Sequence, residues 1–166
     1  MTATARYVLA DCRSAVAELV DGVQGSAWRR NWVLSVVLLR TVGHVLANVD
    51  SARSENLRRA IEEWWGQLRA TKPEPAVFWQ FIENDRNLVL KEYQINVEYG
   101  ITLRIPLRHF FPAPGDEEPL APATTEYRYE VASGPYKGDD QRTVLREAIA
   151  WWEVQLSKID RAASET

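Results

Sequence analysis

Residues 32–39 read WVLSVVLL, the most apolar stretch of the chain, and Arg40 follows directly. His44 comes four residues after Arg40, and Asn48 comes four residues after His44. Residues four apart share one face of a helix, so these three side chains should form a polar stripe on a largely buried helix. A buried arginine is costly unless it is paired and hydrogen-bonded. The sequence therefore predicts a central helix whose polar stripe meets a carboxylate, a partner chain or an anionic ligand.

Apolar residues recur at helical spacing in four segments of the first part of the chain. Ser26 and Ser54 stand where N-caps of the second and third helices would lie. The expected helices cover residues 4–23, residues 27–49, a third segment that begins at Ser51 or Ser54 and ends before Lys72, and residues 76–93. Because the connections are short, an up-and-down four-helix bundle is favoured over residues 1–93.

The pattern changes after residue 93. The odd-numbered positions from Ile95 to Ile105 are apolar or aromatic, which is the period of a half-buried strand, and residues 127–131 alternate in the same way. The segment 111–125, FPAPGDEEPLAPATT, is rich in proline and acids and predicts a loop.

A last helix is expected to begin at Asp139 or Asp140, since acidic residues suit a helix N-terminus. Residues 94–166 therefore predict a small antiparallel β-sheet and a C-terminal helix that packs with the bundle as one domain. The fold class is α+β, mainly α.

Two segments of the chain resemble each other. LRRAIEEWWGQL (57–68) aligns without gaps to LREAIAWWEVQL (145–156). The pattern indicates either two amphipathic helices under similar packing demands or a duplicated docking helix with tryptophan anchors. We favour the packing interpretation, because amphipathic helices converge on such a pattern.

Composition limits the classes of function. A net charge of −3 argues against a general electrostatic grip on nucleic acid or on an anionic membrane. Cys12 is the single cysteine, so no intramolecular disulfide is possible and a cytoplasmic setting is favoured. We identify no signal pattern and no apolar run of membrane-spanning length, and we expect no membrane partner.

The predicted fourth helix carries a second polar pair. At about 100° per residue, Asp85 and Arg86 fall within or at the edge of its apolar arc. The residues expected on the opposite side are Glu83, Asn87 and Lys91. We therefore predict that Asp85 and Arg86 meet Arg40 and His44 across the helix interface, with Asp85 paired to Arg40 or to His44.

Such a cluster has two interpretations. It can be a buried ion-pair network that fixes helix register, which is the interpretation we favour. Alternatively, two arginines against one carboxylate leave local positive charge that suits a phosphate or a carboxylate. Two histidines cannot build an all-histidine zinc site, and no cysteine or histidine cluster has ligand spacing, so we expect no metal and no cofactor.

A helical bundle with Arg86 followed by Asn87 resembles the HEPN superfamily over about the first 95 residues. The signature of that family is an arginine, often followed by asparagine, and a histidine after four to six residues. In this chain Lys91 stands where the shortest version has histidine. The resemblance implies a helical bundle of the kind found in metal-independent ribonucleases of toxin–antitoxin, CRISPR and phage-defence systems.

The departure at Lys91 leaves alternatives open. A lysine with its ordinary pKa near 10.4 is a poor base at neutral pH, although it can bind phosphate. The leading prediction is therefore a small intracellular interaction protein with a protein partner or a homodimer, in a defence or toxin–antitoxin setting. The first alternative is a ribonuclease with RNA as partner, in which Arg86 and His44 are catalytic and Asn87 and Lys91 assist. The second is a sensor of an anionic small ligand at the same cluster.

The strands allow a further interpretation. Tyr99 and Arg104 on one strand, with Tyr127, Arg128 and Tyr129 on the other, interleave aromatic and basic side chains. Such strands can stack nucleic-acid bases. We favour instead an amphipathic sheet that is covered by the last helix, because aromatic residues are common in strands.

Overall fold

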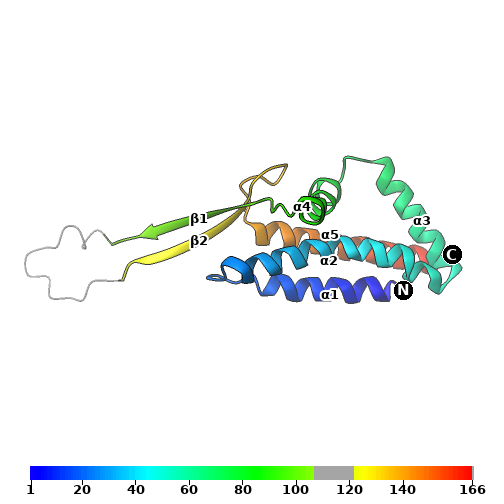
Figure 1. Cartoon of the computed structure of the whole chain (residues 1–166). Helices are drawn as coiled ribbons and strands as arrows, with labels where there is room; N and C mark the ends of the chain where they lie inside the picture. Colours follow the sequence, from blue (N-terminus) through cyan, green and yellow to red (C-terminus); the bar gives the residue numbers. More distant parts are fainter. Residues whose placement is uncertain (107–121, 166) are drawn as a thin grey trace, which may run out of the picture.

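The computed structural model describes residues 1–106 and 122–165 of the chain. It is mainly helical with a two-stranded antiparallel sheet, which confirms the predicted α+β, mainly α class (Figure 1). The predicted loop 111–125 lies outside the described residues up to position 121. Its last two positions, 124 and 125, belong to the second strand rather than to a loop.

Three helices lie side by side along the body of the molecule. Helix α1 (Ala3–Ala17) and helix α2 (Gly25–Asn48) are antiparallel, and helix α5 (Gln141–Glu165) runs alongside both (Figure 1). Helix α1 is shorter than predicted, because a loop that includes Gly22 at a φ of +88° separates it from α2. Ser26 is not the N-cap of α2, since the helix already begins at Gly25.

A buried carboxylate connects the start of α1 to the end of α2. Asp50 begins the 3₁₀ turn η1 (Asp50–Arg53) and is fully buried. Its two carboxylate oxygens accept hydrogen bonds from the backbone amides of Thr4 (3.0 Å) and Ala5 (2.9 Å). These amides lie in the first turn of α1, where backbone donors have no intrahelical partner. Asp50 therefore satisfies the N-terminus of α1 from outside that helix.

Helix α3 (Glu55–Ala70) begins as the sequence predicts. The Ser54 hydroxyl oxygen accepts a hydrogen bond from the Leu57 amide at 3.2 Å, which makes Ser54 the N-cap. Helix α3 packs against α5, where the rings of Trp64 and Trp152 have centroids 5.6 Å apart. These two tryptophans occupy equivalent positions in the internal repeat and both are buried, in agreement with the packing interpretation.

The predicted helix 76–93 is divided into two parts. Residues Val77–Glu83 (η2) form a π-helical segment, and a short α-helix, α4 (Asn84–Glu92), follows it. Tyr93 ends α4 in the left-handed conformation at a φ of +52°. A π-helix bonds each residue to the fifth residue along, so its turn is wider than 3.6 residues. The side-chain directions expected from a regular α-helix therefore do not hold across this segment.

The two strands form an arm that leaves the helical body (Figure 1). Strand β1 (Val97–Arg104) pairs with strand β2 (Thr124–Val131) from Val97 opposite Val131 to Arg104 opposite Thr124. At the base of the arm, the Tyr129 ring stacks on Trp28 with centroids 4.3 Å apart. The Tyr129 hydroxyl donates a hydrogen bond to the Val23 carbonyl at 3.3 Å. These contacts hold the base of the arm to the start of α2.

The expectation that the last helix covers the sheet is wrong for the outer part of the arm. Helix α5 begins at the base of the arm and runs away from it (Figure 1). Tyr99, Ile101 and Leu103 are consequently exposed to 47%, 60% and 57%. The alternation in β1 correctly predicts two faces, but the apolar face is buried only near the body.

One helical stretch among residues 1–106 and 122–165 is long and apolar enough to cross a membrane. It is Gly25–Arg53, with a mean hydropathy of 1.6, and it differs from our expectation that no run approaches that length. Core helices pass the same test, and α2 contributes Trp32, Val36 and Leu39 to the core. This is weak evidence for a membrane span, and the cytoplasmic location stays a prediction.

Candidate functional site

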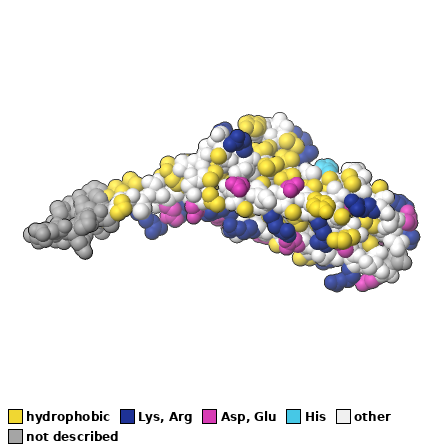
Figure 2. Space-filling model, turned by 90° about the horizontal axis from the view of Figure 1, so that it is seen from below, with side chains coloured by type: hydrophobic (Ala, Val, Ile, Leu, Met, Phe, Trp, Pro, Cys, Tyr) yellow, Lys and Arg dark blue, Asp and Glu magenta, His cyan; other side chains and the backbone are white. Residues whose placement is uncertain are grey.

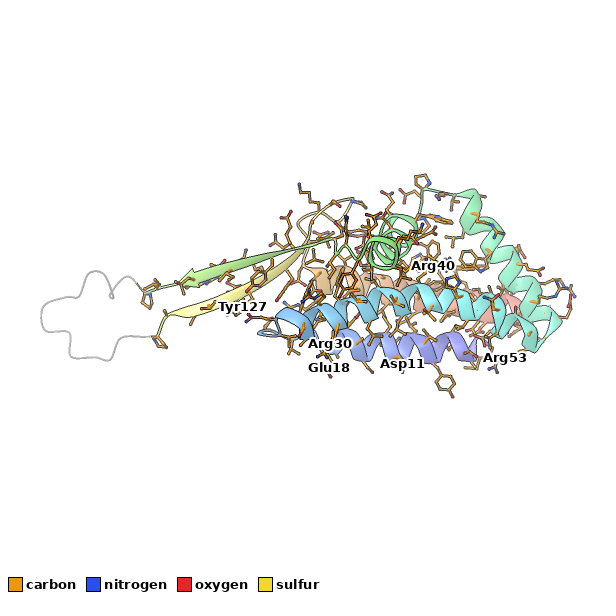
Figure 3. The ribbon with its side chains drawn as sticks, in the orientation of Figure 1. Asp11, Glu18, Arg30, Arg40, Arg53 and Tyr127 are labelled. Carbon is orange, nitrogen blue, oxygen red and sulfur yellow. The ribbon has the colours of Figure 1, made fainter. Side chains whose placement is uncertain are left out.

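Arg40 belongs to α2, and its side chain lies between this helix and the η2–α4 segment (Figure 3). The side chain is half-buried, and its guanidinium carbon is 5.8 Å from the ring centroids of both Trp65 on α3 and Phe78 on η2. At this distance an arginine is attracted to the face of an aromatic ring. Nη1 is fully buried and has no hydrogen-bond partner among residues 1–106 and 122–165. Residues of α2, α3 and η2 thus hold the guanidinium of Arg40 in place. Its N–H groups donate no hydrogen bond within the described part of the protein.

Gly43 has no side chain, and this leaves room for the guanidinium of Arg40. A Cβ atom built on Gly43 would lie 3.2 Å from Arg40 Nη1, 3.2 Å from Trp152 Cη2 and 3.3 Å from Trp65 Cζ2. These distances are shorter than ordinary van der Waals contacts. Glycine in a helix interior costs about 0.5–1 kcal/mol relative to alanine. At this position the cost is offset by the close approach of two indole rings and the guanidinium.

The charged groups near Arg40 are mainly positive. Burial lowers the pKa of Arg40 from its ordinary value, the negative charge of Glu83 opposes this, and the positive charge of Arg86 adds to it. His44 is exposed, so the prediction that it belongs to a buried cluster is wrong. Partial burial still lowers the pKa of His44, and the charges of Arg40 and Arg86 lower it further. The His44 imidazole is therefore mostly neutral at pH 7 and can accept a proton. Arg40, His44, Glu83 and Arg86 together are called the Arg40 cluster below.

Asp85 does not belong to this cluster, and its predicted pairing with Arg40 is wrong. Asp85 is 1% exposed, and its Oδ1 accepts hydrogen bonds from the amides of Asn84 (3.4 Å) and Asn96 (3.3 Å). Its Oδ2 is buried and accepts no hydrogen bond from any residue that the structure describes. Burial raises the pKa of Asp85 to about 6. The negative charge that acts on Arg40 comes from Glu83 and not from Asp85. The wide turns of η2 change the side-chain directions in this segment from those expected of a regular α-helix.

The remaining predicted site residues are only partly brought together. Arg86 donates from Nη1 to the Asn87 side-chain oxygen at 2.8 Å, so Asn87 lies at the edge of the cluster. Lys91 is exposed in the last turn of α4 and makes no ion pair within the described part of the chain. Asn48 is exposed and donates to the His44 carbonyl oxygen at 2.9 Å, so its amide serves its own helix.

Sequence reasoning missed Glu83, Trp65, Phe78 and Gly43. The aromatic side chains come from other elements, and their meeting with Arg40 has no local signal. Gly43 does give a local signal in the sequence, because a glycine inside an apolar helix indicates that another group packs closely against the helix backbone.

The described residues offer neither a reactive thiol at Cys12 nor a metal-binding site. Burial raises the pKa of the Cys12 thiol to about 12, so the reactive thiolate is scarce at neutral pH. Its Sγ donates to the Ser35 carbonyl oxygen at 3.5 Å. Among residues 1–106 and 122–165, no group of three or more His, Cys, Asp or Glu side chains is placed to hold a metal ion.

Comparison with known proteins gives no relative. No protein-family model matches the chain, and no curated protein or solved structure matches it either.

Gly43→Ala should destabilise the protein. The added methyl group would raise helix propensity, but the crowding against Trp65, Trp152 and Arg40 should cost about 1–3 kcal/mol and outweigh that gain. Gly66→Ala on α3 is the matched control, since a Cβ there meets no atom within 4 Å, and it should stabilise by about 0.5–1 kcal/mol. Urea denaturation measures both variants. Equal stabilisation by the two substitutions would contradict the close packing around Arg40.

Asp85→Asn should stabilise the protein at neutral pH. The pKa of about 6 in the folded state exceeds the ordinary 3.8, so the folded state binds more protons between these values. Stability should therefore fall as pH rises from about 4 to about 6, and the neutral amide should remove this loss. We expect a gain of about 1–3 kcal/mol at pH 7 that shrinks toward pH 4, measured by urea denaturation. Asp11→Asn on the outer face of α1 is the control, and an equal gain there would contradict the prediction (Figure 3).

Proposed function

We propose that the chain is an intracellular interaction protein that binds another protein through the apolar face of its arm. The observation that carries this proposal is the exposure of Tyr99, Ile101 and Leu103. They lie on a hairpin that leaves the body (Figure 1), and hydrophobic side chains are visible at the surface of this arm (Figure 2). Single apolar residues on a surface are normal, whereas a contiguous apolar patch marks an interaction site.

The strand register places the apolar side chains on one face. Residues directly opposite each other in an antiparallel pair share a face, so Ile101 lies beside Tyr127, and Tyr99 lies beside Tyr129. The rings of Tyr99 and Tyr127 are stacked with centroids 6.0 Å apart. Stacked aromatic rings offer a large and rigid contact area, as anchor residues at protein interfaces do.

The other face of the arm is polar. The side chains that lie on it are Glu98, Thr102, Arg104, Glu126, Arg128 and Glu130. Arg104 and Glu126 form an ion pair at 3.0 Å on this face. A two-stranded hairpin by itself is at best marginally stable in water. An arm with one solvated polar face and one bare apolar face is therefore suited to a partner that covers the apolar face.

The resemblance to the HEPN superfamily supplies the setting of this proposal. Arg86 and Asn87 carry that resemblance. Arg86 belongs to the Arg40 cluster, and Asn87 accepts a hydrogen bond from it. We propose a HEPN-like helical protein in a toxin–antitoxin or phage-defence system, with a protein partner or a second copy on the arm.

Ile101→Gln should weaken partner binding at least tenfold, because it places a polar side chain in the middle of the apolar row. Thr102→Gln is the matched control, since the neighbouring side chain lies on the polar face. A partner is first isolated from the native cells with the wild-type chain, and its affinity for the purified variants is then measured by calorimetry. Circular dichroism checks that both variants keep their helices. Equal affinities for the two variants would place the interface elsewhere and contradict the proposal.

A metal-independent ribonuclease is the second candidate function. The observation that favours it is a neutral His44 within electrostatic reach of two arginines, Arg40 and Arg86. The imidazole can accept the proton of an attacking hydroxyl group while the guanidinium groups stabilise the charge on the phosphate.

If the chain is such an enzyme, it should cleave labelled single-stranded or structured RNA in EDTA. His44→Ala and Arg86→Ala should each lower the rate at least a hundredfold, the lower limit of general acid–base catalysis. Arg29→Ala is the control, because Arg29 is exposed and makes no ion pair within the described residues. Absence of cleavage by the wild type, or unchanged rates in both site variants, would count against this candidate.

A further inference from the structure

Arg40 differs from the other half-buried arginines of the body in having no hydrogen-bond acceptor among the residues that the structure describes. Arg142 donates to Asp21 (2.6 Å) and Asp140 (3.1 Å), and Arg6 donates to Asp160 (2.8 Å). In contrast, Arg40 makes no hydrogen bond and no ion pair within residues 1–106 and 122–165. A partly desolvated guanidinium without an acceptor costs free energy, and an acceptor from outside the chain would offset that cost.

The guanidinium has a closed side and an open side. On the closed side, Nη1 of Arg40 is buried beside Gly43 and the indoles of Trp65 and Trp152 and has no contact with solvent. Nε and Nη2 keep contact with solvent and donate to no acceptor within the described part of the chain. The rings of Trp65 and Phe78 hold the planar group in place. A guanidinium that is fixed in this way offers two parallel donors to an oxyanion and loses little conformational entropy on binding.

The surrounding charges favour an anion. Arg86 and His44 interact electrostatically with Arg40, and Glu83 is the acidic group that acts on it. With His44 neutral, two guanidinium groups and one carboxylate leave one net positive charge. The neutral imidazole can in addition donate one hydrogen bond.

We propose that the Arg40 cluster binds the phosphate group of a small molecule, with the open edge of Arg40 as its main ligand and with Arg86 and His44 beside it. This inference is independent of the docking function of the arm, because it uses residues of α2 and α4 and none of β1 or β2. It also requires no cleavage of RNA. A phosphate is favoured over a carboxylate, because its greater charge matches two guanidinium groups.

The test is a titration of the full chain at pH 7.5 with inorganic phosphate and with phenyl phosphate, against sodium chloride of equal ionic strength. Phosphate should raise the melting temperature in a saturable way, since a ligand specific for the folded state must stabilise it. Acetate should raise it less. Calorimetry then gives the dissociation constants of the variants.

Arg40→Gln should weaken phosphate binding at least tenfold, whereas Arg29→Gln on the same helix should leave it unchanged. Arg40→Lys keeps the charge without the planar fork, and it should also weaken binding at least tenfold even if Arg40→Gln fails to fold. The proposal would be overturned by a thermal shift that chloride reproduces, by no saturable shift with either phosphate compound, or by equal affinity in Arg40→Lys and the wild type.

Discussion

The packing of Phe78 among tryptophan side chains is the constraint on which the rest of the structure depends. The Phe78 ring, fully buried on η2, contacts four indole rings at centroid distances of 4.9–5.9 Å. These rings belong to Trp65, Trp79, Trp151 and Trp152. Aromatic side chains bury large areas and prefer edge-to-face contacts, so this cluster ties η2 to α3 and α5. It also forms the wall against which Arg40 lies, and the position of the guanidinium follows from aromatic packing.

Two different surfaces of the described molecule carry groups that a ligand or a partner could contact. The arm exposes Ile101 and Leu103, whose burial by a partner would be favourable because it removes apolar area from water. The Arg40 cluster instead presents Nε and Nη2 of Arg40, which donate no hydrogen bond within the described residues and from which an anion would accept. The first surface favours a protein partner and the second a small charged ligand. Both can serve one protein, since an interaction protein can also carry a ligand that stabilises its folded state.

Several elements follow from local sequence. The Ser54 cap of α3, the alternation in β1 and β2, and the helix at the C-terminus are predicted correctly, because capping and periodicity are properties of neighbouring residues. The π-helical turns of η2 are not predictable in this way. Phe78 and Phe81 are three residues apart and would share a face of a regular α-helix as well, so their spacing contains no signal of the wider turns. The carboxylate that acts on Arg40 is Glu83 and not the expected Asp85.

The sequence by itself determined that a polar stripe lies on a central apolar helix and that His44 follows Arg40 on it. It also determined an amphipathic hairpin, since alternation assigns each side chain to a face. Only the tertiary structure decided which groups meet Arg40 and whether the hairpin is covered. Those outcomes depend on the direction of α5 and on contacts between residues far apart in sequence, such as Arg40 with Phe78 and Gly43 with Trp152. Local propensity contains no information about such contacts, because they form when separate elements pack together.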